Sequence, residues 1–251
     1  MDMNREKMYH LGLSHDQGAE YAILTGDPGR VQSIAGMLDS PEFVCCNREY
    51  TTWAGTLEGA RVLVVSHGIG GPSTAICVEE LNKIGVHTMI RVGTCGGMAK
   101  QVRAGDLVVA TAAIRQEGTS QEYLPIEFPA VSDFNVTAAL TLAARKTGRR
   151  VHAGVVHCKD SFYGQHRPED SPVGYELIAK WRAYIKAGCL ASEMESATLF
   201  AVAASRGIYA GCVLHVLWNQ ELENQEAVHD TSHAGAAAVN AIGMLITGKS
   251  E

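Results

Sequence analysis

Residues 61–85, RVLVVSHGIGGPSTAICVEELNKIG, join a short apolar run to a longer stretch with helical spacing through a glycine-rich turn. The run from Arg61 to Ser66 predicts a buried strand. Pro72, which is favoured in the first turn of a helix, and Gly85, which commonly follows the last turn, predict a helix over residues 72–84. Strand, turn and helix in this order are the repeating unit of an α/β fold.

The same alternation continues in both directions along the chain. Several short runs are almost entirely apolar, so helices should cover both faces of the sheet. No internal repeat or Pro/Ser-rich linker divides residues 1–251, which favours a single domain. The predicted strands are 21–25, 61–66, 88–92, 106–111, 151–158 and 209–218, and the predicted helices are 29–38, 72–84, 135–147, 172–187, 193–205 and 232–246.

Composition excludes several classes of protein. With 21 Lys+Arg against 27 Asp+Glu, the net charge is -6, which argues against the clustered positive surface that nucleic acid requires. The first residues lack the apolar core of a secretion signal, and no apolar run approaches the roughly 18 residues of a membrane span. The seven cysteines form no C-x-x-C pair and predict reduced thiols rather than a disulfide framework or a zinc site. We therefore expect a cytoplasmic protein with neither nucleic-acid nor membrane partners.

Glycine supplies 26 of the 251 residues, above the usual ~7%, and much of the excess follows predicted strands, where open α/β sheets bind ligands. Two of these turns carry an arginine: Gly26 precedes Arg30, and Arg91 lies beside Thr94. Backbone N–H groups next to a guanidinium suit an anion. On local pattern, a tight turn with a solvated Arg30 is about as plausible, and a structural ion pair is favoured for Arg91.

A third glycine-rich turn, residues 66–73, superficially resembles a dinucleotide-binding fingerprint. It lacks the required spacing to a third glycine, so a nicotinamide cofactor is not expected. Close packing of a helix against the sheet explains its individual glycines more simply.

Ser192-Glu193-Met194-Glu195 has the S-x-x-E spacing of a helix capping box, and the local pattern favours that structural interpretation. Two carboxylates one residue apart point to different sides of a helix, which argues against a glycosidase pair. If Glu195 instead faces a pocket, it can accept hydrogen bonds from the vicinal hydroxyls of a ribose.

The segment 162–167, FYGQHR, follows a predicted strand and combines an aromatic ring, an amide and a guanidinium. The planar amide of Gln165 could read the O2/N3 edge of a pyrimidine while Arg167 donates to a carbonyl oxygen. An exposed loop with a stacking aromatic has the same composition, and without further context the loop is the preferred interpretation.

Together these segments resemble the nucleoside phosphorylase family whose subunits form trimers of dimers, and residues 162–167 resemble its uridine phosphorylase branch. The likeness covers nearly the whole chain in order, and the combination is specific although no single motif is. It implies a single α/β domain with a mixed central sheet flanked by helices, assembled into dimers and a hexamer. The segments that carry the resemblance are 10–13, 26–30, 48–53, 68–73, 91–94, 127–131 and 193–198.

The resemblance also implies roles for individual residues. Those implied to hold phosphate are Gly26, Arg30, Arg91 and Thr94, with Arg48 supplied by the neighbouring subunit. Those implied to hold the ribose are Glu193, Met194 and Glu195, with the neighbour's His10 at the 5'-hydroxyl. Those implied to hold uracil are Phe162, Gln165 and Arg167. Those that match a potassium site between paired subunits in similar enzymes are Glu49, Ile69 and Ser73.

The implied reaction is reversible: uridine and phosphate give uracil and ribose 1-phosphate, and no organic cofactor is needed. A phosphate oxygen attacks C1' in an oxocarbenium-like transition state, without a covalent intermediate, so the protein must orient a dianion and stabilise charge on the departing base. The residues implied in catalysis are Arg91, Thr94, Gln165, Arg167 and Glu195. Three alternatives stay open: a purine nucleoside phosphorylase, a nucleosidase that uses water, and a non-catalytic nucleoside-binding protein.

The chain departs from the family pattern near the base. The 162–167 segment is one residue shorter than usual and lacks a proline, Gln220 stands where relatives often carry a second arginine, and residues 221–231 are shortened. Purine-specific relatives carry an aspartate in this region to protonate the base, whereas residues 217–220, LWNQ, contain no carboxylate, which favours a pyrimidine.

Overall fold

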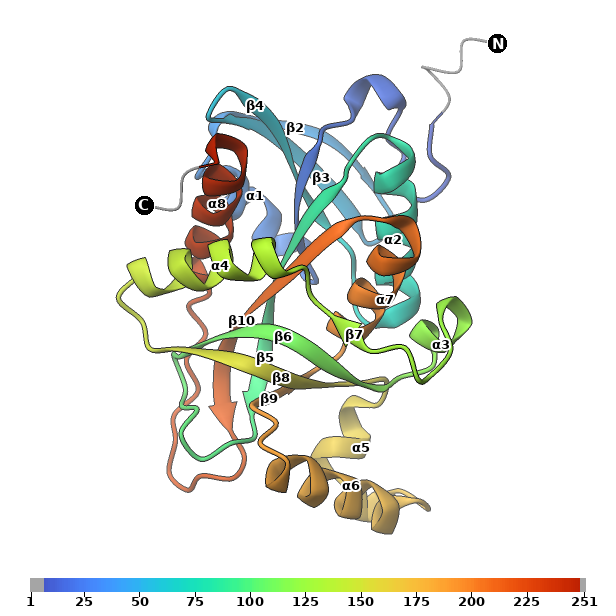
Figure 1. Cartoon of the computed structure of the whole chain (residues 1–251), viewed down its shortest axis with the longest axis vertical. Coiled ribbons are helices and arrows are strands. Elements are labelled where there is room, and N and C mark those ends of the chain that lie inside the picture. Colours follow the sequence, from blue (N-terminus) through green and yellow to red (C-terminus); the bar gives the residue numbers. More distant parts are fainter. Residues whose placement is uncertain (1–6, 249–251) are drawn as a thin grey trace.

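The computed structural model describes residues 7–248, which form one mixed sheet with helices on both faces (Figure 1). The strands are β1 (Tyr21–Thr25), β2 (Asp39–Asn47), β3 (Tyr50–Leu57), β4 (Ala60–Ser66), β5 (Thr88–Gly97), β6 (Leu107–Gln116), β7 (Ala130–Val131), β8 (Val151–Lys159), β9 (Ala191–Glu193) and β10 (Tyr209–Asn219). The helices are α1 (Val31–Ala35), α2 (Gly71–Lys83), α3 (Thr119–Tyr123), α4 (Phe134–Lys146), α5 (Phe162–His166), α6 (Gly174–Lys186), α7 (Ser196–Arg206) and α8 (Ser232–Thr247).

The sheet closes on itself at one end. Strand β5 pairs in parallel with β10 and antiparallel with β9, while β10 pairs with β6, β6 with β8, and β8 with β9. These five strands therefore form a closed ring. From β5 the sheet continues through β1, β4 and β3 to the edge strand β2. The expected mixed α/β fold is confirmed.

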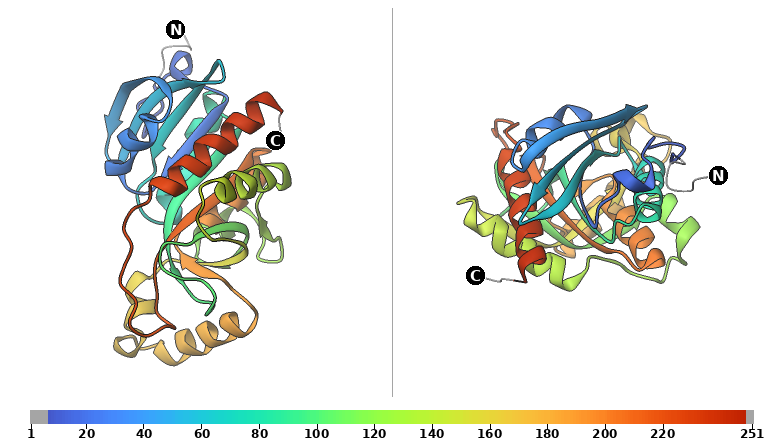
Figure 2. Two further views of the ribbon diagram at one scale, coloured as in Figure 1. Left: turned by 90° about the vertical axis from the view of Figure 1, so that its left-hand side faces the viewer. Right: turned by 90° about the horizontal axis from the view of Figure 1, so that it is seen from above.

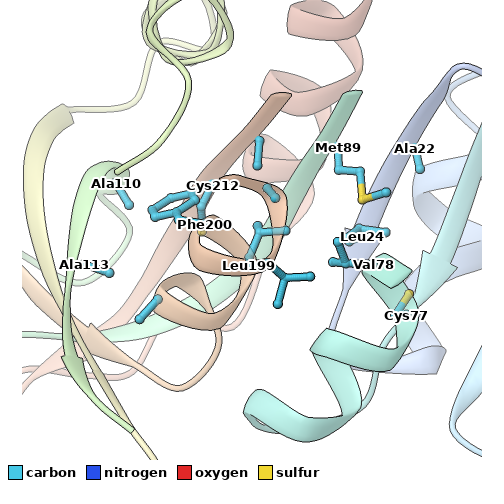
Figure 3. Packing of buried hydrophobic residues seen from close by; sticks show 14 of the residues in the cluster. Ala22, Leu24, Cys77, Val78, Met89, Ala110, Ala113, Leu199, Phe200 and Cys212 are labelled. Carbon is cyan, nitrogen blue, oxygen red and sulfur yellow. The ribbon is translucent and has the colours of Figure 1, made fainter. Parts of the chain in front are cut away.

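Helices cover the two faces of the sheet through two separate apolar cores. Helices α1, α4 and α8 pack on one face, and α4 lies beside α8 (Figures 1 and 2). Helices α2 and α7 pack on the other, where Val78 and Leu199 lie over Leu24 and Met89 of the sheet (Figure 3). Phe200 is fully buried there, and truncating such a side chain costs about 3–5 kcal/mol. No helix between residues 7 and 248 combines the length and apolar character that a membrane crossing requires.

All six predicted strands and all six predicted helices are present. Strand β1 has the predicted bounds, and the ends of the other elements are shifted. The hairpin β2–β3 was not predicted, because β2 is an edge strand with mostly exposed residues and only a short apolar run over residues 43–46. Strand β5 continues to Gly97, five residues beyond its predicted end. It does so because it pairs with β10 as far as Asn219 and with β9 at Gly96 and Gly97. Gly93 leaves room for the Arg91 side chain, which a Cβ there would overlap.

Parallel pairing of β1, β4 and β5 brings the glycine-rich turns and Arg91 to one edge of the sheet. Thr25 at the end of β1 pairs with Ser66 at the end of β4, and Leu24 pairs with Arg91. The two following turns are in contact, since a Cβ on Gly26 would lie 3.1 Å from the Gly68 carbonyl oxygen. On the closed ring, β8 and β9 end side by side. The sheet thus gathers segments that are far apart in the sequence.

Candidate functional site

A cavity of about 620 Å³ lies where these strand ends meet. It is lined by the turns after β1 and β4, by the last part of β5, by α5, by residues 192–195 and by residues 217–218. A second cavity of about 420 Å³ lies beside it, against α6. Lys159 and Gln165 line both cavities and form the wall between them.

One end of the main cavity holds two arginines with unused donors. Asp27 accepts a hydrogen bond from the Gly29 N–H at 2.9 Å and lies 3.5 Å from Arg30 Nε, so it fixes the turn and the side chain together. Arg30 Nη1 and Arg91 Nε are buried, and neither meets an acceptor within residues 7–248. Burial lowers the pKa of Arg30, against the opposing charge of Asp27. Buried donors without acceptors are rare in folded proteins, so this end is suited to an anion.

Arg91 is held in place by two carboxylates. Its side chain is only 4% exposed, its Nη2 donates to Glu195, and the same nitrogen lies 3.5 Å from Glu193 Oε2. Burial alone would lower the pKa of Arg91, but Glu195 and Glu193 outweigh burial and raise it. The ion pair favoured on local pattern is therefore present, and Nε remains free to serve a ligand as well.

The expected capping box at Ser192 and Glu195 is wrong. Helix α7 begins at Ser196, and the carboxylate of Glu193 accepts the backbone N–H groups of Glu195 at 2.9 Å and Ser196 at 3.0 Å. Glu195 instead accepts the Gly70 N–H at 2.8 Å and a donor from Arg91. Arg91 outweighs the effect of burial and holds the pKa of Glu195 below its usual range. Glu195 is thus an ionised acceptor in the cavity wall, with lone pairs left for sugar hydroxyls.

A second end of the main cavity, separate from the Arg30 and Arg91 donors, is made by Lys159, Phe162, Gln165, His166 and Trp218. Helix α5 is capped by Ser161, whose hydroxyl accepts the Gly164 N–H. The helix places Gln165 near β5, where a Cβ on Gly96 would lie 3.8 Å from the amide nitrogen. The rings of His166 and Trp218 stack at 5.6 Å. This end therefore contains aromatic rings for stacking, an amide for hydrogen bonding and a lysine ammonium.

Lys159 is the buried cation of this end. It is 6% exposed, and it donates to Ser192 Oγ at 3.0 Å and to the Glu193 carbonyl oxygen at 3.4 Å. No carboxylate within the described residues forms an ion pair with it, and burial lowers its pKa. A buried ammonium with only neutral acceptors is suited to a ligand that develops negative charge.

Most of the predicted site residues line the main cavity, and four do not. Those that line it are Gly26, Arg30, Glu49, Ile69, Arg91, Thr94, Phe162, Gln165, Glu193, Met194 and Glu195. Those that lie outside it are His10, Arg48, Ser73 and Arg167.

Arg167 was expected to hold uracil, but the structure does not bring it to either cavity. Helix α5 ends at His166, and the backbone then leaves helical geometry, so Arg167 is exposed at the helix end. His166 lines the cavity in its place.

His10 and Arg48 were expected to act in a neighbouring subunit's site, and neither lines the main cavity of its own chain. His10 Nδ1 lies 2.8 Å from Glu80 Oε1. Arg48 occupies the β2–β3 turn with a positive φ of 55°, is exposed, and lies with its guanidinium 5.9 Å from the ring centre of Tyr9.

The residues matched to a potassium site are brought together only in part. Ser73 Oγ donates to Glu49 Oε1 at 3.0 Å, while Ile69 lies on the exposed turn that precedes α2. Carboxylate and hydroxyl oxygens are suitable ligands for a hard cation. Residues 7–248 contain no cluster of three or more His, Cys, Asp and Glu side chains that could hold a metal ion.

Four residues of the site were not predicted from the sequence: Lys159, His166, Ser192 and Trp218. No local motif unites them, because they come from β8, α5, β9 and β10. The sequence contained one indication of Lys159. This residue directly follows the run predicted as a strand over 151–158, and a lysine at that place is either buried or marks the end of the strand.

The region that matches known proteins includes the whole site. Residues 20–246, which include every residue lining the two cavities, match the family model described as the phosphorylase superfamily. The chain is 53% identical over 243 residues to the uridine phosphorylase of Treponema pallidum, covering 95% of this chain and 94% of that protein. It is 41% identical over 256 residues to the uridine phosphorylase of Escherichia coli, covering 97% and 100%. It is 40% identical over 220 residues to the guanosine phosphorylase of Halorubrum lacusprofundi, covering 88% and 87%.

Proposed function

The chain belongs to the phosphorylase superfamily, and from this premise we propose that it catalyses the reversible phosphorolysis of uridine to uracil and ribose 1-phosphate. The uridine phosphorylases of T. pallidum and E. coli, which align over nearly its whole length, support this substrate. The observation that carries the proposal is that Arg30 and Arg91, which each have a buried donor without an acceptor, line the same cavity as Glu195.

In the proposed reaction, Arg30, Arg91, Thr94 and the N–H of Gly26 hold phosphate. Glu195 accepts hydrogen bonds from the ribose hydroxyls and stays ionised because Arg91 pairs with it. A phosphate oxygen then attacks C1' as the bond to the base lengthens. Fixing the dianion in line with that bond supplies much of the rate enhancement.

Lys159 and Gln165 stabilise the departing base. Negative charge spreads over the two carbonyl oxygens of uracil as the N-glycosidic bond breaks. The Lys159 ammonium and the Gln165 N–H are donors already fixed in the cavity wall by their hydrogen bonds to Ser192 and Gln220, and preorganised donors of this kind stabilise developing charge. They perform the role that was expected of Arg167, and Phe162 provides an aromatic surface for the ring.

We call the end of the main cavity formed by Lys159, Gln165 and the rings beside them the base end. Its chemistry favours a pyrimidine over a purine. Lys159, Phe162, Gln165, His166, Leu217 and Trp218 include no carboxylate that could protonate a purine. Because a guanosine phosphorylase is among the relatives, the experiment below also includes purine nucleosides.

We also propose the assembly and setting of the enzyme. Arg48 and His10 lie outside the cavity of their own chain, which supports a dimer-based hexamer in which each reaches a neighbouring site. Glu49 and Ser73, with the Ile69 turn, would hold a potassium ion between paired subunits. All seven cysteines are free thiols, which supports a reducing cytoplasmic setting. Phosphate is the co-substrate, and no organic cofactor is required.

The test is to incubate the purified protein with uridine, guanosine or inosine, each with and without phosphate, and to quantify the free bases. We expect uracil from uridine only when phosphate is present, with ribose 1-phosphate in equal amount. Release of purine base alone would overturn the base assignment, and uracil release without phosphate would indicate a nucleosidase. Binding of uridine without turnover would indicate a non-catalytic binding protein.

A further inference from the structure

The hydroxyl of Ser192 lies at the centre of a buried hydrogen-bond network in the wall between the two cavities. It is 2.7 Å from Gln165 Oε1, 3.0 Å from Lys159 Nζ and 3.1 Å from His157 Nδ1. A hydroxyl has one hydrogen and two lone pairs. Because a lysine ammonium can only donate, Gln165 and His157 compete for the single Ser192 hydrogen.

His157 lies on the far side of this wall and lines only the second cavity. It is 4% exposed, its Nε2 lies 3.1 Å from Gln116 Oε1, and its ring packs 5.1 Å from that of Tyr184. Burial and the charge of Lys159 lower the pKa of His157 to about 3, so the imidazole is neutral at neutral pH and carries one N–H.

A neutral His157 allows two complete networks. In the first, Nδ1–H donates to Ser192, the Ser192 hydrogen goes to the Gln165 oxygen, and Gln116 turns its –NH2 group toward Nε2. In the second, Ser192 donates to an unprotonated Nδ1, and Gln165 must turn its own –NH2 group toward Ser192. The two networks therefore present opposite ends of the Gln165 amide to any ligand.

Gln220 decides between these networks. Gln165 Nε2 donates to Gln220 Oε1 at 3.1 Å, so reversing the Gln165 amide would force Gln220 to reverse as well. Within the described residues, His157 is the side-chain partner of the Gln116 amide, so turning Gln116 disrupts no other bond. Amide and imidazole orientations are assigned from such networks. The first network, with hydrogen on Nδ1, therefore requires one amide to turn, whereas the second requires both Gln165 and Gln220 to turn.

We propose that His157 is a positioning residue that fixes, through Ser192, the donor–acceptor order of the Gln165 amide and thereby selects uracil over cytosine. This inference rests on the proposed function. Uracil presents O2, N3–H and O4, whereas cytosine presents O2, an unprotonated N3 and an amino group. An amide locked in one orientation pairs with one N3 and leaves the other unmatched, and unmatched buried polar groups are strongly disfavoured.

The test replaces His157 by Phe, which keeps a ring against Tyr184 but removes both nitrogens. His157→Asn is the rescue variant, because its amide N–H can occupy the place of Nδ1–H. Tyr184→Leu is the matched control, because it removes the packing beside the imidazole without removing a member of the network. If His157→Phe does not fold, His157→Leu removes the same donor with less bulk.

The readouts are kcat/KM for uridine and the inhibition constants of uracil and cytosine. In His157→Phe we expect kcat/KM to fall about tenfold and the cytosine-to-uracil ratio of inhibition constants to fall about tenfold, while His157→Asn and Tyr184→Leu keep the native ratio. An unchanged ratio in His157→Phe, or an equal loss of ratio in Tyr184→Leu, would overturn the inference.

A double variant separates this inference from the proposed function. In a Gln165→Ala background, His157→Phe should cause no further loss, because its effect passes through that amide. A further tenfold loss would contradict the positioning role while leaving uridine phosphorolysis intact. Absence of uridine turnover in the unmodified protein would instead overturn the proposed function itself.

Discussion

The two ends of the main cavity are built by different means. At the phosphate end, the donors are permanently charged guanidinium groups, and Asp27, Glu193 and Glu195 hold them in place. At the base end, a chain of neutral groups surrounds a single ammonium, with Ser192 and Gln165 linking Lys159 to the second cavity.

This difference follows from the two ligands. Phosphate keeps its charge throughout the reaction, so fixed cations serve both its binding and its orientation. Uracil is neutral when bound and gains charge only as the bond breaks, so the base end must read a neutral edge and stabilise a transient anion. We therefore expect mutations at the phosphate end to affect binding and stability together, and mutations at the base end to affect the chemical step.

The largest effect is expected for Arg91→Ala. It removes a phosphate donor and leaves Glu195 and Glu193 buried without their cation, so kcat/KM should fall about 10³-fold. The free energy of unfolding should fall by about 3–5 kcal/mol, because a buried charge loses its partner. Steady-state kinetics and chemical unfolding measure the two effects.

Arg61→Ala is the matched control, because Arg61 pairs with Glu42 at 3.0 Å on the surface and should affect neither quantity. If Arg91→Ala retained near-native kcat/KM, the phosphate end would be misplaced.

Lys159→Met should lower the rate without weakening phosphate binding. The methionine keeps the unbranched stem but removes the ammonium, so we expect a loss of about 2.7–4 kcal/mol of transition-state stabilisation, seen mainly in kcat. The KM for phosphate should change less than about threefold. The exposed Lys180→Met serves as the control. An effect of Lys159→Met on the phosphate KM alone would remove the contrast between the two ends.

The phosphate end was largely predictable from the sequence, because its residues sit in contiguous strand–turn segments. Gly26 and Arg30 share one turn, and Arg91 and Thr94 lie three residues apart, so local pattern sufficed to nominate them. What the pattern could not decide was whether Arg91 pairs with a carboxylate or with a ligand, because Glu195 approaches it from 104 residues away.

The base end could not be predicted in the same way. Ser192 meets Lys159 and His157 only because β8 and β9 pair in parallel, with His157 opposite Ser192. The S-x-x-E pattern was misread for a related reason: a capping box and a Glu-capped helix that starts at Ser196 have the same local residues. The position of Arg167 depends on where a helix of one turn ends, which the spacing of its side chains does not reveal.

Gln165 and Arg167 provide a smaller and sharper contrast. Gln165→Ala should lose about 1.5–3 kcal/mol of transition-state stabilisation for uridine, as expected for a hydrogen bond to a group that becomes charged. Arg167→Ala should change kcat/KM less than about threefold, because the side chain lies outside both cavities. The reverse order in uridine kinetics would show that α5 rearranges when the base binds.

The smallest signal is expected from mixed assemblies. Arg48→Ala and Arg91→Ala chains should each be inactive, but a dimer that contains one of each should regain part of the activity, since one of its two sites is then complete. Co-expression with two affinity tags isolates the mixed species for assay. No recovery in verified mixed dimers would mean that the phosphate end is complete within one chain.

The central claim is that Arg30 Nη1 and Arg91 Nε hold phosphate beneath the anomeric carbon of a ribose gripped by Glu195. A crystal structure with phosphate and an unreactive uridine analogue tests it most directly. We predict a tetrahedral anion within about 3.2 Å of both nitrogens, with C1' facing one of its oxygens. Phosphate bound elsewhere, with both donors turned toward protein acceptors, would contradict it.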